Sequence, residues 1–162
     1  MKTRITVGAF LICKDKVLLI KRGMHKKLAP GLWGGVGGHM EPHEMNNPIA
    51  TAYREIEEEA GISPNDIFDL KLRYMAVRNR IGDGDDEIST MYYYTGNVSS
   101  EVELPECDEG ILHWIYLKDA VDLPMSFSVK QILTHWLSNT EKTEVFLLGV
   151  NKDNNGVTFV EL

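Results

Sequence analysis

The densest group of chemically capable side chains is the glutamate cluster in residues 54–62, REIEEEAGI. Four carboxylates fall within five consecutive positions. Like charges at this spacing repel one another and raise one another's pKa, so the cluster favours a cation between its members. Hard divalent cations take oxygen ligands, and the residue types therefore indicate Mg²⁺ or Mn²⁺.

A helix must position these carboxylates, and the flanking residues predict one over about residues 47–60. Asn47 can cap its start, Pro48 is tolerated at the first helical position, and Gly61 supplies a stop. An apolar stripe runs along the segment at three- and four-residue steps and consists of Ile49, Ala52, Tyr53, Ile56 and Ala60.

Three of the glutamates share one face of this helix. Glu55, Glu58 and Glu59 stand at positions i, i+3 and i+4, so their carboxylates can converge on one point. Arg54 lies four residues before Glu58 and can also reach back toward the preceding turn, where it can orient a carboxylate through a bidentate contact. Glu57 points elsewhere and is expected to be solvated.

A glutamate run taken alone is more typical of a solvent-exposed helix than of a metal site. The upstream segment 34–44, GGVGGHMEPHE, changes that balance. Its glycines permit close approach of the backbone to a ligand, and Glu41 and Glu44 add two carboxylates beside the helix start. No Gly-Lys-Ser/Thr follows, so the segment does not predict a P-loop.

Together these residues resemble the Nudix box, which reads G-x5-E-x7-R-E-U-x-E-E-x-G-U with U an aliphatic residue. The positions that match in order are Gly38, Glu44, Arg54, Glu55, Ile56, Glu58, Glu59, Gly61 and Ile62. Nine residues, rather than the seven of the motif, separate Glu44 from Arg54, which lengthens the loop before the helix. Val36 stands where many members of the family have proline.

The resemblance implies an α+β fold, an α/β/α sandwich with a mixed β-sheet between helices. Hydrophobic patterning agrees, because it predicts a second helix at 129–137 and strands at 5–13, 17–21, 68–77, 89–98, 111–117, 144–150 and 157–162. Leu70, Leu72, Tyr74 and Ala76 are expected on one face of their strand, and Tyr93 on the face opposite Tyr92 and Tyr94.

We expect residues 1–162 to form a single Nudix hydrolase domain. Residues 143–162 form a predicted hairpin around the turn Asn154-Asn155-Gly156. This hairpin either extends the sheet or contributes to a subunit contact, so a homodimer is left open.

The resemblance also implies roles for individual residues. It assigns the metal to Glu55, Glu58, Glu59 and the carbonyl of Gly38, catalysis to Arg54, Glu55, Glu58 and Glu109, and substrate binding to Arg22, Gly37 and Gly38. The general base is left open among Glu55, Glu58 and Glu109.

Several alternatives accompany these assignments. Glu106 and Asp108 compete with Glu109, and Glu87 is a weaker candidate that a solvated turn explains as well. Lys26 and Lys27 could steer an anion, although surface lysines usually contribute little.

The substrate class follows from family marks that this sequence lacks. It has no upstream coenzyme A hydrolase signature, no proline around Ala76-Val77-Arg78 as in ADP-ribose hydrolases, and no tyrosine near residues 79–81 as in the dinucleoside-polyphosphate type. The chain is therefore most similar to MutT-type enzymes, which split nucleoside triphosphates, sometimes oxidised ones such as 8-oxo-dGTP, into monophosphate and pyrophosphate. The alternatives are another nucleoside diphosphate derivative (ADP-ribose, a nucleotide sugar or a dinucleoside polyphosphate), a non-hydrolytic nucleotide sensor, or an isopentenyl-diphosphate-type isomerase, for which Cys13 is poorly placed.

Composition limits the partners. The chain has 162 residues, 43 % of them hydrophobic, and a net charge of −7. A negative surface disfavours nucleic-acid polymers and anionic membranes, so a small nucleotide is the expected partner. Cys13 and Cys107 lack metal or redox spacing and are expected as free thiols in a cytoplasmic protein, and the N-terminal apolar run breaks too early for a signal peptide.

Overall fold

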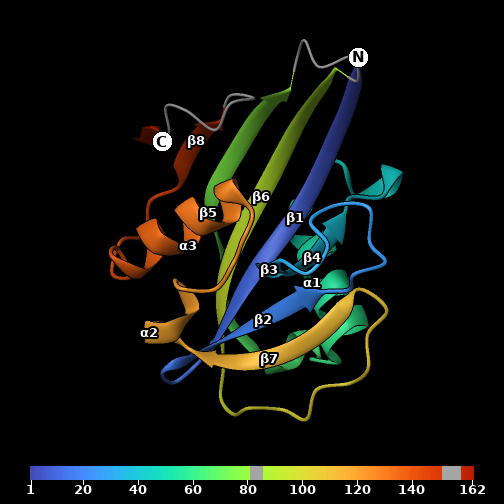
Figure 1. Ribbon diagram of the computed structural model, residues 1–162. Coiled ribbons are helices and arrows are strands. Elements are labelled where there is room, and N and C mark those ends of the chain that lie inside the picture. The colour runs from blue at the N-terminus through green and yellow to red at the C-terminus, as the bar shows by residue number, and fades with distance from the viewer. Residues whose placement is uncertain (81–85, 151–157) are drawn as a thin grey trace.

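A mixed β-sheet runs through the molecule, as seen in a computed structural model that describes residues 1–80, 86–150 and 158–162 (Figure 1). Over these ranges the strands are β1 Lys2–Cys13, β2 Lys16–Arg22, β3 Trp33–Gly34, β4 Val36–His39, β5 Ile67–Arg80, β6 Glu87–Val98, β7 Gly110–Tyr116, β8 Phe146–Val150 and β9 Thr158–Glu161. Their order is β3-β2-β1-β6-β5-β8-β9, with β4 paired to β1 and β7 paired to β2. The pairs β1–β6 and β5–β8 are parallel and the others antiparallel, which confirms the predicted mixed sheet.

Two helices cover opposite faces of this sheet. The helical elements are α1 Pro48–Ala60, α2 Leu117–Ala120 and α3 Phe127–Leu137, with 3₁₀ turns η1 Pro42–Glu44 and η2 Pro64–Asp66. Alternate residues of β1 divide the core between them: Val7 and Leu11 pack in the cluster that contains Ile56 of α1, and Phe10 packs in the cluster that contains Leu133 of α3. The predicted α+β sandwich is therefore confirmed, whereas α2, η1 and η2 were not predicted.

Helix α1 begins and ends where the sequence predicts, but its start lacks the expected side-chain cap bond. Pro48 opens it and Gly61 closes it in the left-handed conformation (φ 67°), where glycine carries no steric penalty. Asn47 occupies the N-cap position, as predicted, but its side chain accepts no hydrogen bond from the helix within the described structure. The preceding turn η1 fixes this residue instead, through a bond from the Asn47 N–H to the Glu44 carbonyl (2.7 Å).

Strand β5 does not keep one face, contrary to the prediction. Leu70 and Leu72 pack in the cluster under α1, whereas Tyr74 and Ala76 pack under α3. The register with β6 shifts between Leu72 and Tyr74, so a bulge adds one residue there and inverts the alternation. On β6 the alternation is regular, and Tyr93 faces α3 opposite its two neighbours as predicted.

The C-terminal strands add to the sheet beyond β5. Strand β8 pairs parallel with β5, and β9 pairs antiparallel with β8. The predicted turn at Asn154-Asn155-Gly156 lies outside the described residues. Cys13 and Cys107 are free thiols, as predicted. No helix in the described part of the chain has the length and apolar character needed to cross a membrane.

Candidate active site

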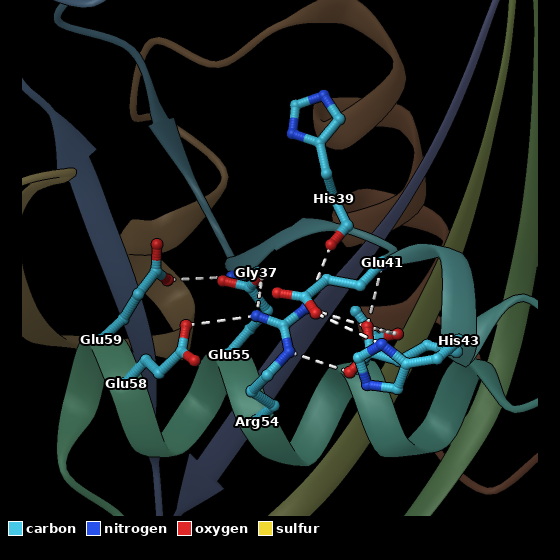
Figure 2. Close-up of polar contacts among 10 residues, drawn as sticks. Gly37, His39, Glu41, His43, Arg54, Glu55, Glu58 and Glu59 are labelled. Atoms are coloured by element: carbon cyan, nitrogen blue, oxygen red, sulfur yellow. Dashed lines mark hydrogen bonds and ion pairs between the residues drawn. The ribbon is translucent and has the colours of Figure 1, made fainter.

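Arg54, in the middle of α1, is the centre of a hydrogen-bond network (Figure 2). Its Nε and Nη2 donate to the two carboxylate oxygens of Glu44 at 2.8 and 2.9 Å. Its Nη1 donates to Glu55 Oε1 (2.8 Å) and to Glu58 Oε2 (3.1 Å), and Nη2 also reaches the His39 carbonyl (3.1 Å). One guanidinium therefore orients three carboxylates and ties α1 to the glycine-rich segment, and the predicted bidentate contact is made with Glu44.

Glu44 anchors this network from the loop. It is only 5 % exposed and also accepts hydrogen bonds from the Glu41 N–H (3.0 Å) and the Thr51 hydroxyl (2.8 Å). The Arg54 guanidinium, followed by the Glu41 N–H, lowers the Glu44 pKa to about 2. The two additional residues between Glu44 and Arg54 thus leave their contact intact, because they are accommodated between η1 and Pro48.

Glu59 faces the glycine backbone of β4. Its Oε2 accepts a hydrogen bond from the Gly37 N–H at 2.9 Å, and the residue is 5 % exposed. Burial, together with the charges of Glu55 and Glu109, raises the Glu59 pKa to about 7. Gly37 has φ 153°, and a Cβ there would lie 2.1 Å from the Val7 carbonyl oxygen, so this approach requires glycine.

Gly38 lies directly against Glu55. A Cβ on Gly38 would lie 2.5 Å from Glu55 Oε1, so a larger residue would displace the carboxylate. Burial raises the Glu55 pKa in opposition to its Arg54 partner. Glu55, Glu59 and the backbone of β4 therefore form a compact set of oxygen donors with Glu58 at its rim (Figure 2).

The oxygen atoms of this set are the type of ligand that a hard divalent cation prefers, although in this structure the carboxylates are hydrogen-bonded to Arg54 and Gly37. Among the described residues no three acidic, histidine or cysteine side chains are grouped as a ready metal site. Arg54 holds Glu55 and Glu58, while Glu59 is bonded to Gly37. The donors are all oxygen, and the pKa values of Glu55 and Glu59 are raised first by burial and then by neighbouring carboxylates, whose repulsion a cation would relieve.

Arg22 and Glu109, which were predicted separately for substrate binding and catalysis, lie together in the structure. Arg22 Nη1 lies 3.5 Å from Glu109 Oε2, and the Lys26 ammonium pairs with Glu109 Oε1. Glu109 is close enough to Glu59 for its charge to raise the pKa of Glu59. Lys26 was expected to contribute little, but it pairs with Glu109. This pair joins the loop after β2 to a residue just before β7, so no local sequence pattern marks it.

A cavity of about 1140 Å³ connects these groups. Its walls carry the α1 carboxylates, the glycines of β4, the Arg22–Glu109 group, and a sheet surface that includes Ser89, Met91 and Tyr93. Glu106 and Asp108 line the cavity as well. Glu87 also lines it but forms an ion pair with Arg4 (2.9 Å). The sequence analysis did not assign this sheet surface to the site. Its only trace in the sequence is that Ser89, Met91 and Tyr93 are alternate residues of one strand and therefore share a face.

Comparison with known proteins adds a family match. The family model described as the NUDIX domain matches residues 2–137. A search of curated proteins found no match.

Solved structures share the fold over most of the chain. A MutT protein from Bacillus halodurans is 22% identical, with 98% of this chain and 97% of that chain covered and a TM-score of 0.70. The NUDIX domain of Shewanella oneidensis NrtR, solved with ADP ribose, is 22% identical over 86% of this chain and 90% of that chain, with a TM-score of 0.68. The E. coli dihydroneopterin triphosphate pyrophosphohydrolase is 18% identical, with 86% of this chain and 99% of that chain covered and a TM-score of 0.65.

Proposed function

The chain belongs to the Nudix family of hydrolases, and we propose that it hydrolyses a nucleoside triphosphate to a nucleoside monophosphate and pyrophosphate with a divalent cation. It is a pyrophosphohydrolase that acts on phosphoanhydride bonds. One observation carries the proposal: Glu55, Glu58 and Glu59 lie along one face of α1, against the backbone of Gly37 and Gly38, beside a cavity of about 1140 Å³.

The oxygen donors support a role in binding the cation. Mg²⁺ or Mn²⁺ held by Glu55, Glu58, Glu59 and the Gly38 carbonyl would neutralise diphosphate oxygens and lower the pKa of a bound water. Arg54 positions two of these carboxylates, and Glu44 positions Arg54.

Phosphate binding falls to the cations on the other side of the cavity. Arg22 and Lys26 offer donors that can stabilise charge on the transferred phosphoryl group. Phosphate oxygens would compete with Glu109 for both cations, which would free its carboxylate to accept a proton. Glu109 thus stays a candidate for the general base, together with Glu55 and Glu58.

The triphosphate substrate is supported by analogy with the structural neighbours. Two of those described above are a MutT protein and a dihydroneopterin triphosphate pyrophosphohydrolase. A second candidate is ADP-ribose or a related nucleoside diphosphate derivative, which is favoured by the neighbouring NUDIX domain solved with ADP ribose.

A substrate panel tests the proposal. Purified protein with Mg²⁺ or Mn²⁺ is incubated with standard and oxidised nucleoside triphosphates, including 8-oxo-dGTP, and with ADP-ribose, nucleotide sugars and dinucleoside polyphosphates. Chromatography should resolve monophosphate and pyrophosphate from one or a few triphosphates. Turnover of ADP-ribose or sugar nucleotides alone would overturn the substrate, and no turnover with either metal would overturn the reaction.

A further inference from the structure

Arg73 is a buried arginine that forms no close ion pair within the described residues. The residue is 6 % exposed, and its Nε has no hydrogen-bond partner in the described part of the chain. Its Nη2 makes one long contact, 3.5 Å, to the carbonyl of Asn139. None of the ion pairs found among the described residues involves Arg73. A buried charge normally has a partner that offsets its desolvation, so this guanidinium needs an anion.

Two register shifts in β5 bring Arg73 to the wall of a second cavity, beside the end of α3. The register with β6 shifts twice, between Phe68 and Lys71 and between Leu72 and Tyr74. Arg73 is the extra residue of the second shift, and it contacts the segment after α3 while Tyr74 packs beneath α3. In a regular strand these two neighbours would point to opposite faces, and bulges commonly re-aim a side chain in this way.

The cavity has a volume of about 320 Å³ and lies among β5, β6 and the end of α3. No described residue lines both this cavity and the candidate active site. Three cations line it, Arg73, Lys71 and Lys142, together with one acid, Asp69. Its remaining polar walls are Thr95, Asn97, Thr140 and Thr143.

Acids stand near all three cations of this cavity, and backbone hydrogen bonds, followed by the charges of Lys142 and Arg73, lower the pKa of Glu144. Asp69 lies 3.4 Å from Lys71 on the exposed surface, and Glu161 approaches Lys142 only to 3.9 Å. The Glu144 carboxylate accepts a hydrogen bond from the Thr143 N–H at 3.0 Å. The side chains that line the walls are three cations and one acid, a formal charge of +2 before the neighbouring Glu144 and Glu161 are counted.

We propose that this cavity is a second ligand site that binds a phosphate group, with Arg73 as its buried ligand and Lys71 and Lys142 at its rim. The planar guanidinium presents donors matched to phosphate oxygens, and hydroxyl and amide groups nearby can complete their coordination. The volume lies near the lower end of the ~300–1000 Å³ typical of ligand pockets, so it suits a phosphate with at most a small substituent. The site does not depend on the proposed catalytic function.

The test is a titration with inorganic phosphate at constant ionic strength, followed by amide chemical shifts. The wild-type chain should show saturable shifts at Gly96, Asn97 and Thr143, which line the cavity or stand beside it. Arg73→Met should weaken phosphate binding at these amides at least tenfold. Lys118→Met removes the same charge from α2, outside the cavity, and should leave binding unchanged. Equal affinity in the wild type and Arg73→Met would overturn the site.

Folding of the variants is controlled separately. Arg73→Met should melt no lower than the wild type in the absence of phosphate, because it replaces an unpaired buried charge with an apolar chain of similar length. If this variant fails to fold, Lys142→Met keeps the test decisive, since Lys142 is an exposed rim residue whose loss should weaken phosphate binding several-fold. Unchanged binding in Lys142→Met would then count against the site.

A parallel titration with AMP identifies the source of the phosphate group. Inorganic phosphate should bind at the same amides at least as tightly as AMP, which would indicate the free ion. Tighter binding of AMP would indicate the phosphate of a nucleotide and would contradict the size limit set by the cavity. Shifts confined to Gly37 and its neighbours, which line the other cavity, would overturn the proposal without affecting the proposed hydrolysis.

Discussion

At the scale of single residues, the sequence predicted which side chains share a helix face better than it predicted which distant residues are in contact. The i, i+3, i+4 pattern correctly placed Glu55, Glu58 and Glu59 on one side of α1, since helical geometry is local. The pairing of Lys26 with Glu109 could not be predicted, because it joins segments that meet only after β2 and β7 have paired. Through-space partners of this kind leave no periodic trace in a sequence.

Glu58 and Glu57 form a matched pair for testing the carboxylate set. Glu58→Gln should reduce kcat by about a hundredfold or more while barely changing the urea midpoint, because Glu58 is exposed and its carboxylate bonds only to Arg54 within the described structure. Glu57→Gln makes the same chemical change on the solvated side of α1 and should retain wild-type kcat. Near-normal turnover of Glu58→Gln would contradict its role as a metal ligand.

Arg54→Lys separates charge from geometry at the centre of the network. Lysine retains the charge but cannot form the bidentate bond with Glu44 while also reaching Glu55. We expect kcat to fall about a hundredfold, since a small displacement of catalytic groups has this effect. Loss of partners at the buried Glu44 should also reduce the free energy of unfolding by about 1–3 kcal/mol. Steady-state kinetics and urea unfolding measure the two effects, and an unchanged kcat would show that the network is not required for catalysis.

Glu44 should also make the fold sensitive to acid. Its folded pKa of about 2 lies below the ordinary value of 4.5, so its contribution to stability is present above pH 4.5 and is lost as the pH falls toward 2. The urea midpoint of the wild type should therefore fall over this window more steeply than that of Glu44→Gln. Parallel curves for the two proteins would exclude Glu44 as a source of the acid sensitivity.

At the scale of elements, termini were predicted better than irregularities. Pro48 and Gly61 marked the ends of α1 because their backbone preferences are intrinsic. The bulge at Arg73 was missed, because nothing in the alternation of residues 68–77 marks an extra residue, and only pairing with β6 defines it. The side chain of Asn47 makes no capping bond for a similar reason, since the residue is held by the preceding turn η1 through its backbone N–H.

The short strand β4 should depend on Gly37. Gly37→Ala combines a disfavoured backbone conformation with a clash against the Val7 carbonyl, and we expect it to reduce the free energy of unfolding by about 1–3 kcal/mol or more. Gly34→Ala is the matched control for stability, because a Cβ there would meet no atom of the described residues within 4 Å. Urea unfolding of both variants checks this, and equal stability would show that β4 can shift to accommodate a side chain.

At the scale of the molecule, His135 joins elements from three parts of the chain. This α3 residue shares a 2.8 Å hydrogen bond with the Tyr74 hydroxyl of β5 and stacks on Phe159 of β9 at 4.0 Å between ring centroids. Burial, followed by the charges of Lys142 and Arg73, lowers the His135 pKa. The C-terminal strands are thereby fastened to the sheet and α3 by a histidine that favours its neutral form.

Stability should therefore decrease below about pH 6.5. Because the folded pKa of His135 lies below that of the unfolded chain, its contribution is present above the unfolded value and is lost as the pH falls. The urea midpoint should drop between pH 7.5 and 5.5 more in the wild type than in His135→Gln, which retains a polar partner for Tyr74 but does not titrate. The same pH dependence in both proteins would assign the effect to other groups.

The parallel pairing of β1 with β6 also has a consequence for how this chain is made. One edge of β1 pairs with β2 and β4, which are made soon after it, whereas the other edge, over residues 2–12, pairs with residues 87–97 of β6. The nascent chain therefore has an unpaired strand edge, rich in hydrophobic residues that are buried in the folded protein, until β6 has left the ribosome. Such non-local pairing slows folding and exposes the edge to other chains, so the interval between translation of β1 and of β6 is when this protein is most prone to aggregate.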